Sequence, residues 1–133
     1  GGILIEASDM KIDSIGIDIM KKMVDYSKGN LKHFGLKSKI LEGDVADIIK
    51  CKFKAIVTDP PYGISTTTKG EGVEKLMKRC MNIFSENMKQ GERLVMALSK
   101  PELIRNQNYK KIYQFQWYIH KSLTRYILVM ERN

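Results

Sequence analysis

Three short apolar segments, each closed by an aspartate, set the strongest limit on how this chain can fold. They are residues 14–18, 39–44 and 55–59, which end at Asp18, Asp44 and Asp59. Each is rich in β-branched or aliphatic residues, as strands buried in parallel sheets are. Because strands that alternate with helices predict a parallel sheet, we expect the three acids to line the edge formed by the carboxyl ends of the strands.

Helical periodicity follows the first and the third of these segments. Apolar residues recur at helical spacing over residues 20–34, and Gly35 follows as a C-terminal stop. A second amphipathic pattern covers residues 73–88 and ends before Gly91. These patterns predict two helices that each bury one face.

The last third of the chain has strand periodicity. Residues 93–99 predict another strand, and residues 113–120 and 126–131 predict two more, joined by the short link 121–124. A link this short favours an antiparallel hairpin. We therefore predict an α/β fold with a Rossmann-like sheet that is mostly parallel and ends in a C-terminal antiparallel hairpin, with Trp117 packed in it.

The segment Asp59-Pro60-Pro61-Tyr62 is the strongest candidate for chemistry. The two prolines stop the strand and keep the backbone extended and stiff. The tip of the strand therefore presents the Asp59 carboxylate, the Pro60 carbonyl and the Tyr62 ring. Ligands bind at the carboxyl ends of strands in open α/β sheets, although a proline-stiffened turn without function remains the alternative.

Two acceptors side by side suit a substrate that offers two N–H donors. The exocyclic amine of a nucleobase is a poor nucleophile, and hydrogen bonds to Asp59 and Pro60 would aim its lone pair outward. Tyr62 would then offer a flat surface on which an extruded base can stack. The Ser- and Thr-rich segment 63–72 that follows is expected to be a loop that covers the base, or a loop without function.

Charge favours a polyanionic partner. The 133 residues carry a net charge of +8 and have a pI of about 9.5, which favours attraction to nucleic-acid phosphates. Cys51 and Cys80 fit neither a zinc pattern nor a disulfide framework. No apolar segment approaches the length of a membrane span and no signal peptide is recognisable, so we expect a cytoplasmic protein of one domain.

Two features are consistent with a nucleoside cofactor. Asp18, at the end of its strand, can accept from ribose hydroxyls, although a role as N-cap of the next helix is at least as good an explanation. Gly1 and Gly2, which run into residues 3–7, resemble the tail of a glycine-rich loop that opens a helix. Because no strand precedes these glycines, we expect that an upstream strand and part of the loop are missing.

The segment Asp59-Pro60-Pro61-Tyr62 resembles the [D/N/S]-P-P-[Y/F/W] motif of class I S-adenosylmethionine-dependent methyltransferases that modify exocyclic amines. The resemblance extends to Gly-Gly-Ile-Leu-Ile-Glu-Ala, Gly-Ile-Asp, Glu-Gly-Asp, Asp-Pro-Pro-Tyr-Gly-Ile-Ser and His-Lys-Ser-Leu-Thr-Arg. Together these are similar to the archaeal-type tRNA guanine-10 N2-methyltransferases, over nearly the whole chain. In that family an RNA-binding THUMP module usually precedes the catalytic domain, and we expect such a module in the N-terminal region that is missing from these residues.

The resemblance implies a role for each position. The cofactor S-adenosylmethionine would be held by Gly1 and Gly2, by Asp18 at the ribose and by Asp44 at the adenine. The catalytic set would be Asp59, Pro60 and Tyr62, and substrate contacts would come from Pro61, Gly63 and Ser65. The implied activity is methylation of the N2 amine of a guanosine in tRNA, without a metal.

Two alternatives remain open from the sequence. The same four residues would serve a guanine-N2 methyltransferase for ribosomal RNA or an adenine-N6 methyltransferase for DNA. The chain could also be a catalytically silent nucleic-acid-binding fragment. The target nucleotide, the number of methyl groups added and the oligomeric state do not follow from these residues.

Overall fold

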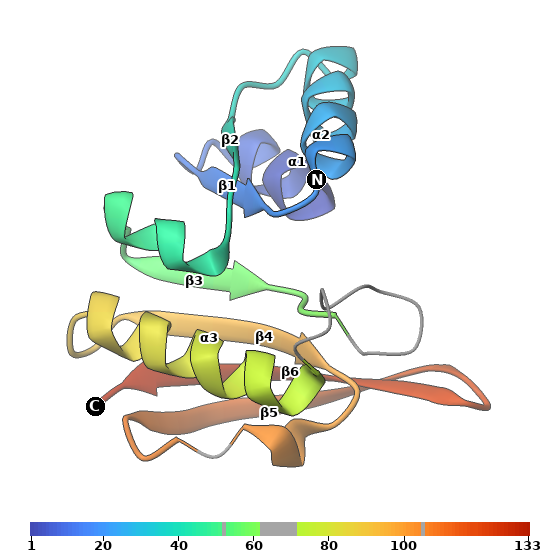
Figure 1. Cartoon of the computed structure of the whole chain (residues 1–133). Helices are drawn as coiled ribbons and strands as arrows, with labels where there is room; N and C mark the ends of the chain where they lie inside the picture. The colour runs from blue at the N-terminus through green and yellow to red at the C-terminus, as the bar shows by residue number, and fades with distance from the viewer. Residues whose placement is uncertain (52, 62–71, 105) are drawn as a thin grey trace. The chain divides into compact units, whose positions relative to one another are not determined.

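The structure is a computed structural model that describes residues 1–51, 53–61, 72–104 and 106–133. The elements follow one another as α1 (Gly2–Asp9), β1 (Ile15–Asp18), α2 (Lys21–His33), β2 (Lys39–Glu42), η1 (Val45–Lys50), β3 (Ala55–Thr58), α3 (Val73–Asn87), β4 (Arg93–Leu98), η2 (Pro101–Leu103), β5 (Tyr109–His120) and β6 (Leu123–Arg132) (Figure 1). The chain divides into two compact units, Gly1–Lys52 and Phe53–Asn133, and each is described by itself.

The first unit is built on a pair of parallel strands. β1 and β2 pair in register from Ile15 opposite Lys39 to Asp18 opposite Glu42. β2 ends at Glu42, two positions before the predicted end at Asp44, because Asp44 begins the short 3-10 helix η1 as its N-cap. Parallel pairing of these two strands is as the sequence predicted.

The helix α2 covers this pair and ends where the sequence placed its stop. Val24 and Leu31 lie on its buried face. Gly35 has a φ of 65°, and the N–H of Leu36 returns to the carbonyl of Leu31 at 2.9 Å. This is the left-handed glycine cap that satisfies the last carbonyls of a helix. Gly29 lies within the helix without interrupting it.

The helix α1 packs through small contacts rather than through a large core. Leu4, its buried residue, lies so close to Gly16 of β1 that a Cβ built on Gly16 would meet a Leu4 methyl group at 2.6 Å. Gly1, the N-cap of α1, lies close against Ser27 of α2. Small residues therefore set the approach of α1 to its neighbours.

The second unit holds a four-stranded sheet in the order β3-β4-β6-β5. β3 and β4 are parallel, whereas β6 is antiparallel to both β4 and β5. The hairpin turn is shorter than predicted: β5 ends at His120 and β6 begins at Leu123. Parallel pairs followed by a C-terminal antiparallel hairpin confirm the predicted fold class.

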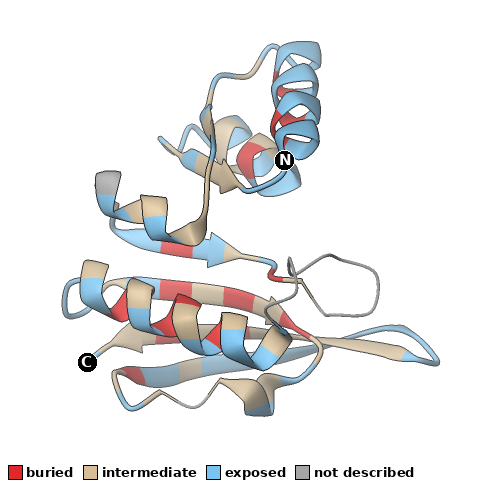
Figure 2. Ribbon diagram, viewed as in Figure 1, coloured by how far each residue is buried: buried red, intermediate tan, exposed pale blue. Residues whose placement is uncertain are grey.

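The core of this unit lies between α3 and one face of the sheet (Figure 2). The pairing of β4 with β6 places Leu94 opposite Met130 and Met96 opposite Leu128, and these four side chains are at most 3% exposed. From α3 the buried side chains are Met77, Cys80, Met81, Phe84 and Ser85. The Nε of Arg132 in β6 donates to the Ser85 carbonyl at 3.0 Å, which fixes the helix on the sheet.

The expectation that Trp117 packs in the sheet is wrong. Tyr113, Phe115 and Trp117 are 59%, 55% and 56% exposed. Their partners in β6 are Val129, Ile127 and Arg125, which alternate with the buried residues Leu128 and Met130. The three rings therefore lie on strand β5, on the face of the sheet opposite α3. Strand periodicity shows that they share a face but does not show whether another element covers that face.

Candidate functional site

In the first unit, the predicted cofactor acids lie together. Asp18 is the last residue of β1, and Asp44 follows β2 after a single glycine. The N–H of Gly43 donates to the Asp18 carbonyl at 3.0 Å. This bond holds the carboxyl ends of the two strands together, so both side chains leave the same edge of the pair.

Each of these two carboxylates also organises the backbone beside it. Asp18 Oδ1 accepts from the N–H of Met20 at 2.8 Å, so it supports the start of α2, although the N-cap itself is Met20. Asp44 Oδ1 accepts from the N–H of Ala46 at 3.0 Å, and Asp47 Oδ2 accepts from the N–H of Asp44 at 3.0 Å. The Asp44 side chain also accepts from the backbone N–H of Asp47, and this bond together with the one from Asp44 to Asp47 Oδ2 forms a capping box, which fixes the direction of η1. The structural role is therefore present at both acids, and cofactor binding stays a prediction.

The glycines at the start of α1 differ from each other. A Cβ added to Gly1 would lie 2.7 Å from the Ser27 hydroxyl oxygen and 3.1 Å from the Ser27 Cα. A Cβ added to Gly2 would meet no atom within 4 Å. Close packing of the chain against α2 thus accounts for glycine at Gly1 without a ligand, whereas packing gives no reason for glycine at Gly2.

In the second unit, Asp59 leaves the carboxyl end of β3 at the surface. Its side chain is 38% exposed, and Pro60 beside it is buried. The backbone is thus anchored by a buried proline while the Asp59 side chain is partly accessible. Pro61 is half-buried. The predicted residues Tyr62, Gly63 and Ser65 lie outside the described residues.

The Asp59 carboxylate has an ionic partner, Arg125, that the sequence did not predict. Nη1 of Arg125, in β6, lies 3.3 Å from Asp59 Oδ2 and donates to it. The only hint in the sequence is that Arg125 closes the His-Lys-Ser-Leu-Thr-Arg segment. Because the two residues are 66 positions apart, no local pattern pairs them.

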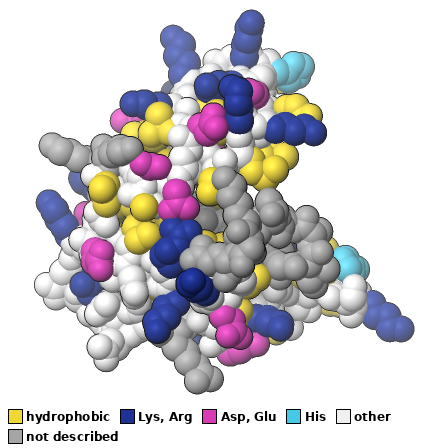
Figure 3. Space-filling model, viewed as in Figure 1, with side chains coloured by type: hydrophobic (Ala, Val, Ile, Leu, Met, Phe, Trp, Pro, Cys, Tyr) yellow, Lys and Arg dark blue, Asp and Glu magenta, His cyan; other side chains and the backbone are white. Residues whose placement is uncertain are grey.

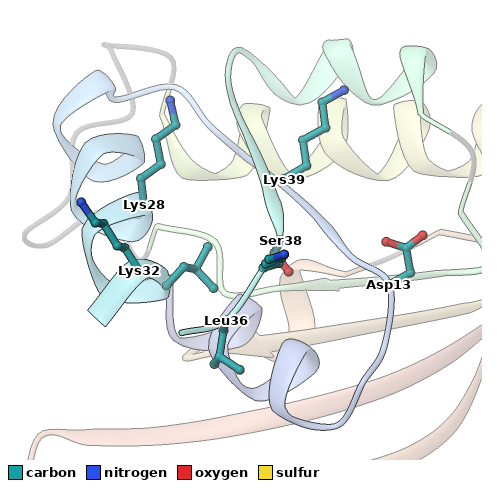
Figure 4. A pocket seen from close by; sticks show the side chains of 8 residues that line it. Asp13, Lys28, Lys32, Leu36, Ser38 and Lys39 are labelled. Atoms are coloured by element: carbon teal, nitrogen blue, oxygen red, sulfur yellow. The ribbon is translucent and has the colours of Figure 1, made fainter. Parts of the chain in front are cut away.

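A lysine-rich pocket lies elsewhere in the first unit, and lysine side chains project around α2 (Figure 3). It is lined by Asp13, Lys28, Leu31, Lys32, Leu36, Lys37, Ser38 and Lys39 (Figure 4). Asp13 precedes β1 and Ser38 precedes β2, so the pocket lies at the amino ends of the strands, away from Asp18 and Asp44. The ammonium groups of Lys28, Lys32 and Lys39 point in different directions, as on a solvated face (Figure 4).

No helix in the described ranges is both long and apolar enough to cross a membrane. Across those same ranges, no group of three or more His, Cys, Asp and Glu side chains is arranged to hold a metal ion.

The fold, together with an Asp-Pro-Pro-Tyr segment at a strand end, defines a methyltransferase domain. The chain belongs to the UPF0020 family, described as RMKL-like, methyltransferase domain, which matches residues 1–125. This places the chain in the class that the sequence motifs indicated.

Several archaeal methyltransferases are similar to this chain over nearly its whole length. The tRNA (guanine(10)-N2)-dimethyltransferase of Methanothermobacter thermautotrophicus is 38% identical over 99% of this chain and 41% of the relative. The protein of the same name from Pyrococcus abyssi is 35% identical over 98% of this chain and 42% of the relative. A probable tRNA (guanine(10)-N2)-dimethyltransferase of Methanothermococcus thermolithotrophicus is 37% identical over 99% and 83%. This chain therefore spans about two fifths of the first two relatives.

Solved structures agree with the fold. TrmN from Thermus thermophilus superposes with a TM-score of 0.84 at 16% identity, covering 100% of this chain and 41% of that one. The tRNA (uracil-54, C5)-methyltransferase of Pyrococcus abyssi, in complex with S-adenosyl-L-homocysteine, gives 0.68 at 12% identity, covering 95% and 30%. Both confirm the class I methyltransferase fold that the sequence predicted.

Proposed function

We propose that the protein containing this chain transfers a methyl group from S-adenosylmethionine to the exocyclic N2 amine of a guanosine in tRNA, at position 10. The observation that carries the proposal is the accessible Asp59 carboxylate at the carboxyl end of β3, beside a buried Pro60. Membership of a methyltransferase family and the names of the archaeal relatives support the choice of tRNA guanine.

The cofactor would be held by the first unit. Asp18 would accept from ribose hydroxyls and Asp44 from the adenine amine, and the position of both acids at one edge of the β1–β2 pair supports these roles. Gly2 opens α1, whose N-terminus favours the negative charge of the cofactor carboxylate. When bound, S-adenosylmethionine supplies a sulfonium methyl group that a nitrogen lone pair attacks, the C–S electron pair leaving on sulfur.

The second unit would hold the base. The Asp59 carboxylate and the Pro60 carbonyl accept the two N–H groups of the guanine amine, which turns the nitrogen lone pair away from the ring system. Tyr62 stacks on the extruded base. The alkylated nitrogen then releases one proton, which Asp59 accepts. Positioning, rather than a covalent intermediate with the protein, accounts for the rate.

The proposal is tested by identifying the product. The intact protein is incubated with radiolabelled S-adenosylmethionine and a panel of tRNA, ribosomal RNA and DNA, and the modified nucleoside is isolated. We expect label in N2-methylguanosine or N2,N2-dimethylguanosine from tRNA only. Label in N6-methyladenine from DNA, or in ribosomal RNA alone, would replace this proposal with one of the alternatives, and no label anywhere would favour a silent binding fragment.

A further inference from the structure

The pair formed by Asp59 and Arg125 follows from the register of the sheet. β4 ends at Leu98, which lies opposite Tyr126 in β6. Arg125 is one position beyond this last pair, at the end of the sheet where β3 delivers Asp59. Thr58 of β3 lies opposite Met96, so Asp59 leaves the sheet near this same end, and the Arg125 side chain reaches it from β6. Nη1 and Oδ2 are 3.3 Å apart.

Stability alone does not explain this ion pair. The Arg125 and Asp59 side chains are 29% and 38% exposed, and pairs this accessible contribute little to folding. A second pair, which joins β4 to the opposite end of β6, offers a comparison. Arg93 Nη2 lies 2.9 Å from Glu131 Oε2, with exposures of 45% and 33%. Both pairs join neighbouring parts of one sheet, but only the first engages the candidate catalytic carboxylate.

A guanidinium that donates to one oxygen limits rotation of a carboxylate. Asp59 follows the last residue of β3, and an aspartate side chain has several staggered rotamers, each of which directs its carboxylate differently. With Oδ2 directed at Arg125, the plane of the carboxylate is set, and with it the direction from which Asp59 accepts a further N–H. Catalysis by positioning is sensitive to displacements of about 1 Å, so this restraint acts directly on the rate.

We propose that Arg125 is a positioning residue for methyl transfer, which orients the Asp59 carboxylate toward the amine of the substrate. This inference rests on the proposed function, because it assigns Asp59 to the substrate amine. Arg125 acts through Asp59 and does not itself touch the reacting nitrogen. The role suits arginine, because its long side chain links β6 to the end of β3 although β4 lies between these two strands, and its planar guanidinium fixes the direction of the bond.

Kinetics of the intact protein test this role with three variants. Arg125→Gln should lower kcat for tRNA on the order of 10- to 100-fold, while KM for tRNA and the Kd for S-adenosylmethionine change less than about twofold. Arg125→Lys should recover part of kcat, because it keeps the charge but not the planar donor group. Arg93→Gln, the matched control, should leave all three constants within about twofold.

Three kinetic outcomes would overturn the proposal. An unchanged kcat in Arg125→Gln would show that the pair is incidental. A raised KM with unchanged kcat would assign Arg125 to RNA binding instead. An equal loss of kcat in Arg93→Gln would mean that any disturbance of this sheet is harmful.

A crystal structure separates this inference from the function on which it rests. In Arg125→Gln we expect the Asp59 side chain to adopt a different rotamer or to occupy more than one rotamer. In Arg93→Gln it should keep the rotamer of the wild type. An unchanged Asp59 rotamer in Arg125→Gln would contradict the positioning role, whatever substrate is methylated. Conversely, a wild-type protein inactive on tRNA would contradict the proposed function while the rotamer comparison still stands.

Discussion

The backbone N–H of Gly43 donates to the carbonyl of Asp18 at 3.0 Å and so ties the end of β2 to the end of β1. A Cβ on Gly43 would lie 2.6 Å from Asp47 Oδ2, the oxygen that accepts from the N–H of Asp44, the N-cap of η1. The glycine thus lets three acids, Asp18, Asp44 and Asp47, crowd one edge of a two-stranded sheet. All three carboxylates accept from backbone N–H groups near the start of a helix.

Asp18→Asn should weaken cofactor binding without disturbing α2. The amide oxygen can still accept from the Met20 N–H, so the fold is kept, but the charge that strengthens bonds to ribose hydroxyls is lost. We expect the Kd for S-adenosylmethionine, measured by calorimetry, to rise about tenfold or more. Asp13→Asn, at the amino end of β1, is the control and should leave the Kd unchanged. Equal Kd values for Asp18→Asn and the wild type would remove Asp18 from the cofactor site.

Alanine at Gly1 and Gly2 should separate packing from ligand contact. Gly1→Ala should lower the free energy of unfolding by about 1–3 kcal/mol, because its methyl group overlaps Ser27, including the Ser27 Cα. Gly2→Ala has open space and should be neutral or slightly stabilising in α1. If Gly2 contacts the cofactor, Gly2→Ala should still raise the Kd for S-adenosylmethionine. Denaturant unfolding and calorimetry measure the two effects; equal stability losses in both variants would contradict the packing explanation.

Asp59→Ala should remove methyl transfer and spare RNA binding. Loss of one preorganised partner of a reacting group lowers kcat by about 10² to 10³. The tRNA Kd, measured by filter binding, should stay within about twofold, since phosphate contacts dominate affinity. Asp25→Ala, on the exposed surface of α2, is the control for the loss of a surface carboxylate. A fall in tRNA affinity as large as the fall in kcat would make Asp59 a structural residue.

Stability at high pH should depend on Tyr109. Burial raises the pKa of Tyr109 from 10.0 to about 12, with Arg132 opposing the shift. The neutral phenol donates to Met88 Sδ at 3.5 Å. Because the folded state keeps its proton to a higher pH than the unfolded chain, this contribution is complete below pH 10 and is lost as pH rises from 10 to 12. The slope for one such group is at most about 1.4 kcal/mol per pH unit.

Tyr109→Phe isolates that contribution from the lysines that titrate in the same range. The difference in unfolding free energy between wild type and variant, measured by denaturant titration, should shrink as the pH rises from 10 toward 12. A difference that stays constant across this interval would contradict the assignment.

Local signals in the sequence predict local structure well here. Gly35 ends α2 as expected because only a residue that tolerates a positive φ makes that cap. The strand ending at Thr58 is predicted because two prolines follow Asp59 and cannot extend the ladder. The predicted end of the second strand at Asp44 is two residues too late. The strand pattern continues to Asp44, but the capping box of Asp44 and Asp47 already begins the helix η1 there.

Contacts between distant segments are not predicted in the same way. Trp117 alternates correctly for a strand, but periodicity does not say that its face of the sheet lies opposite α3. The partnership of Arg125 with Asp59 depends on where β4 ends relative to β6, a property of sheet register. The prediction that Asp59 shares an edge with Asp18 and Asp44 stays a prediction, since the two units are described separately.

The central claim, that Asp59 and Pro60 grip the N2 amine of guanine, is tested most directly by removing that amine from the substrate. A tRNA carrying inosine in place of guanosine at position 10 keeps the ring and its pairing but lacks the exocyclic nitrogen. With labelled S-adenosylmethionine, we predict methylation of the guanosine tRNA at N2 and none of the inosine tRNA. Equal methylation of both, or label on a ring nitrogen of the guanosine, would contradict the account.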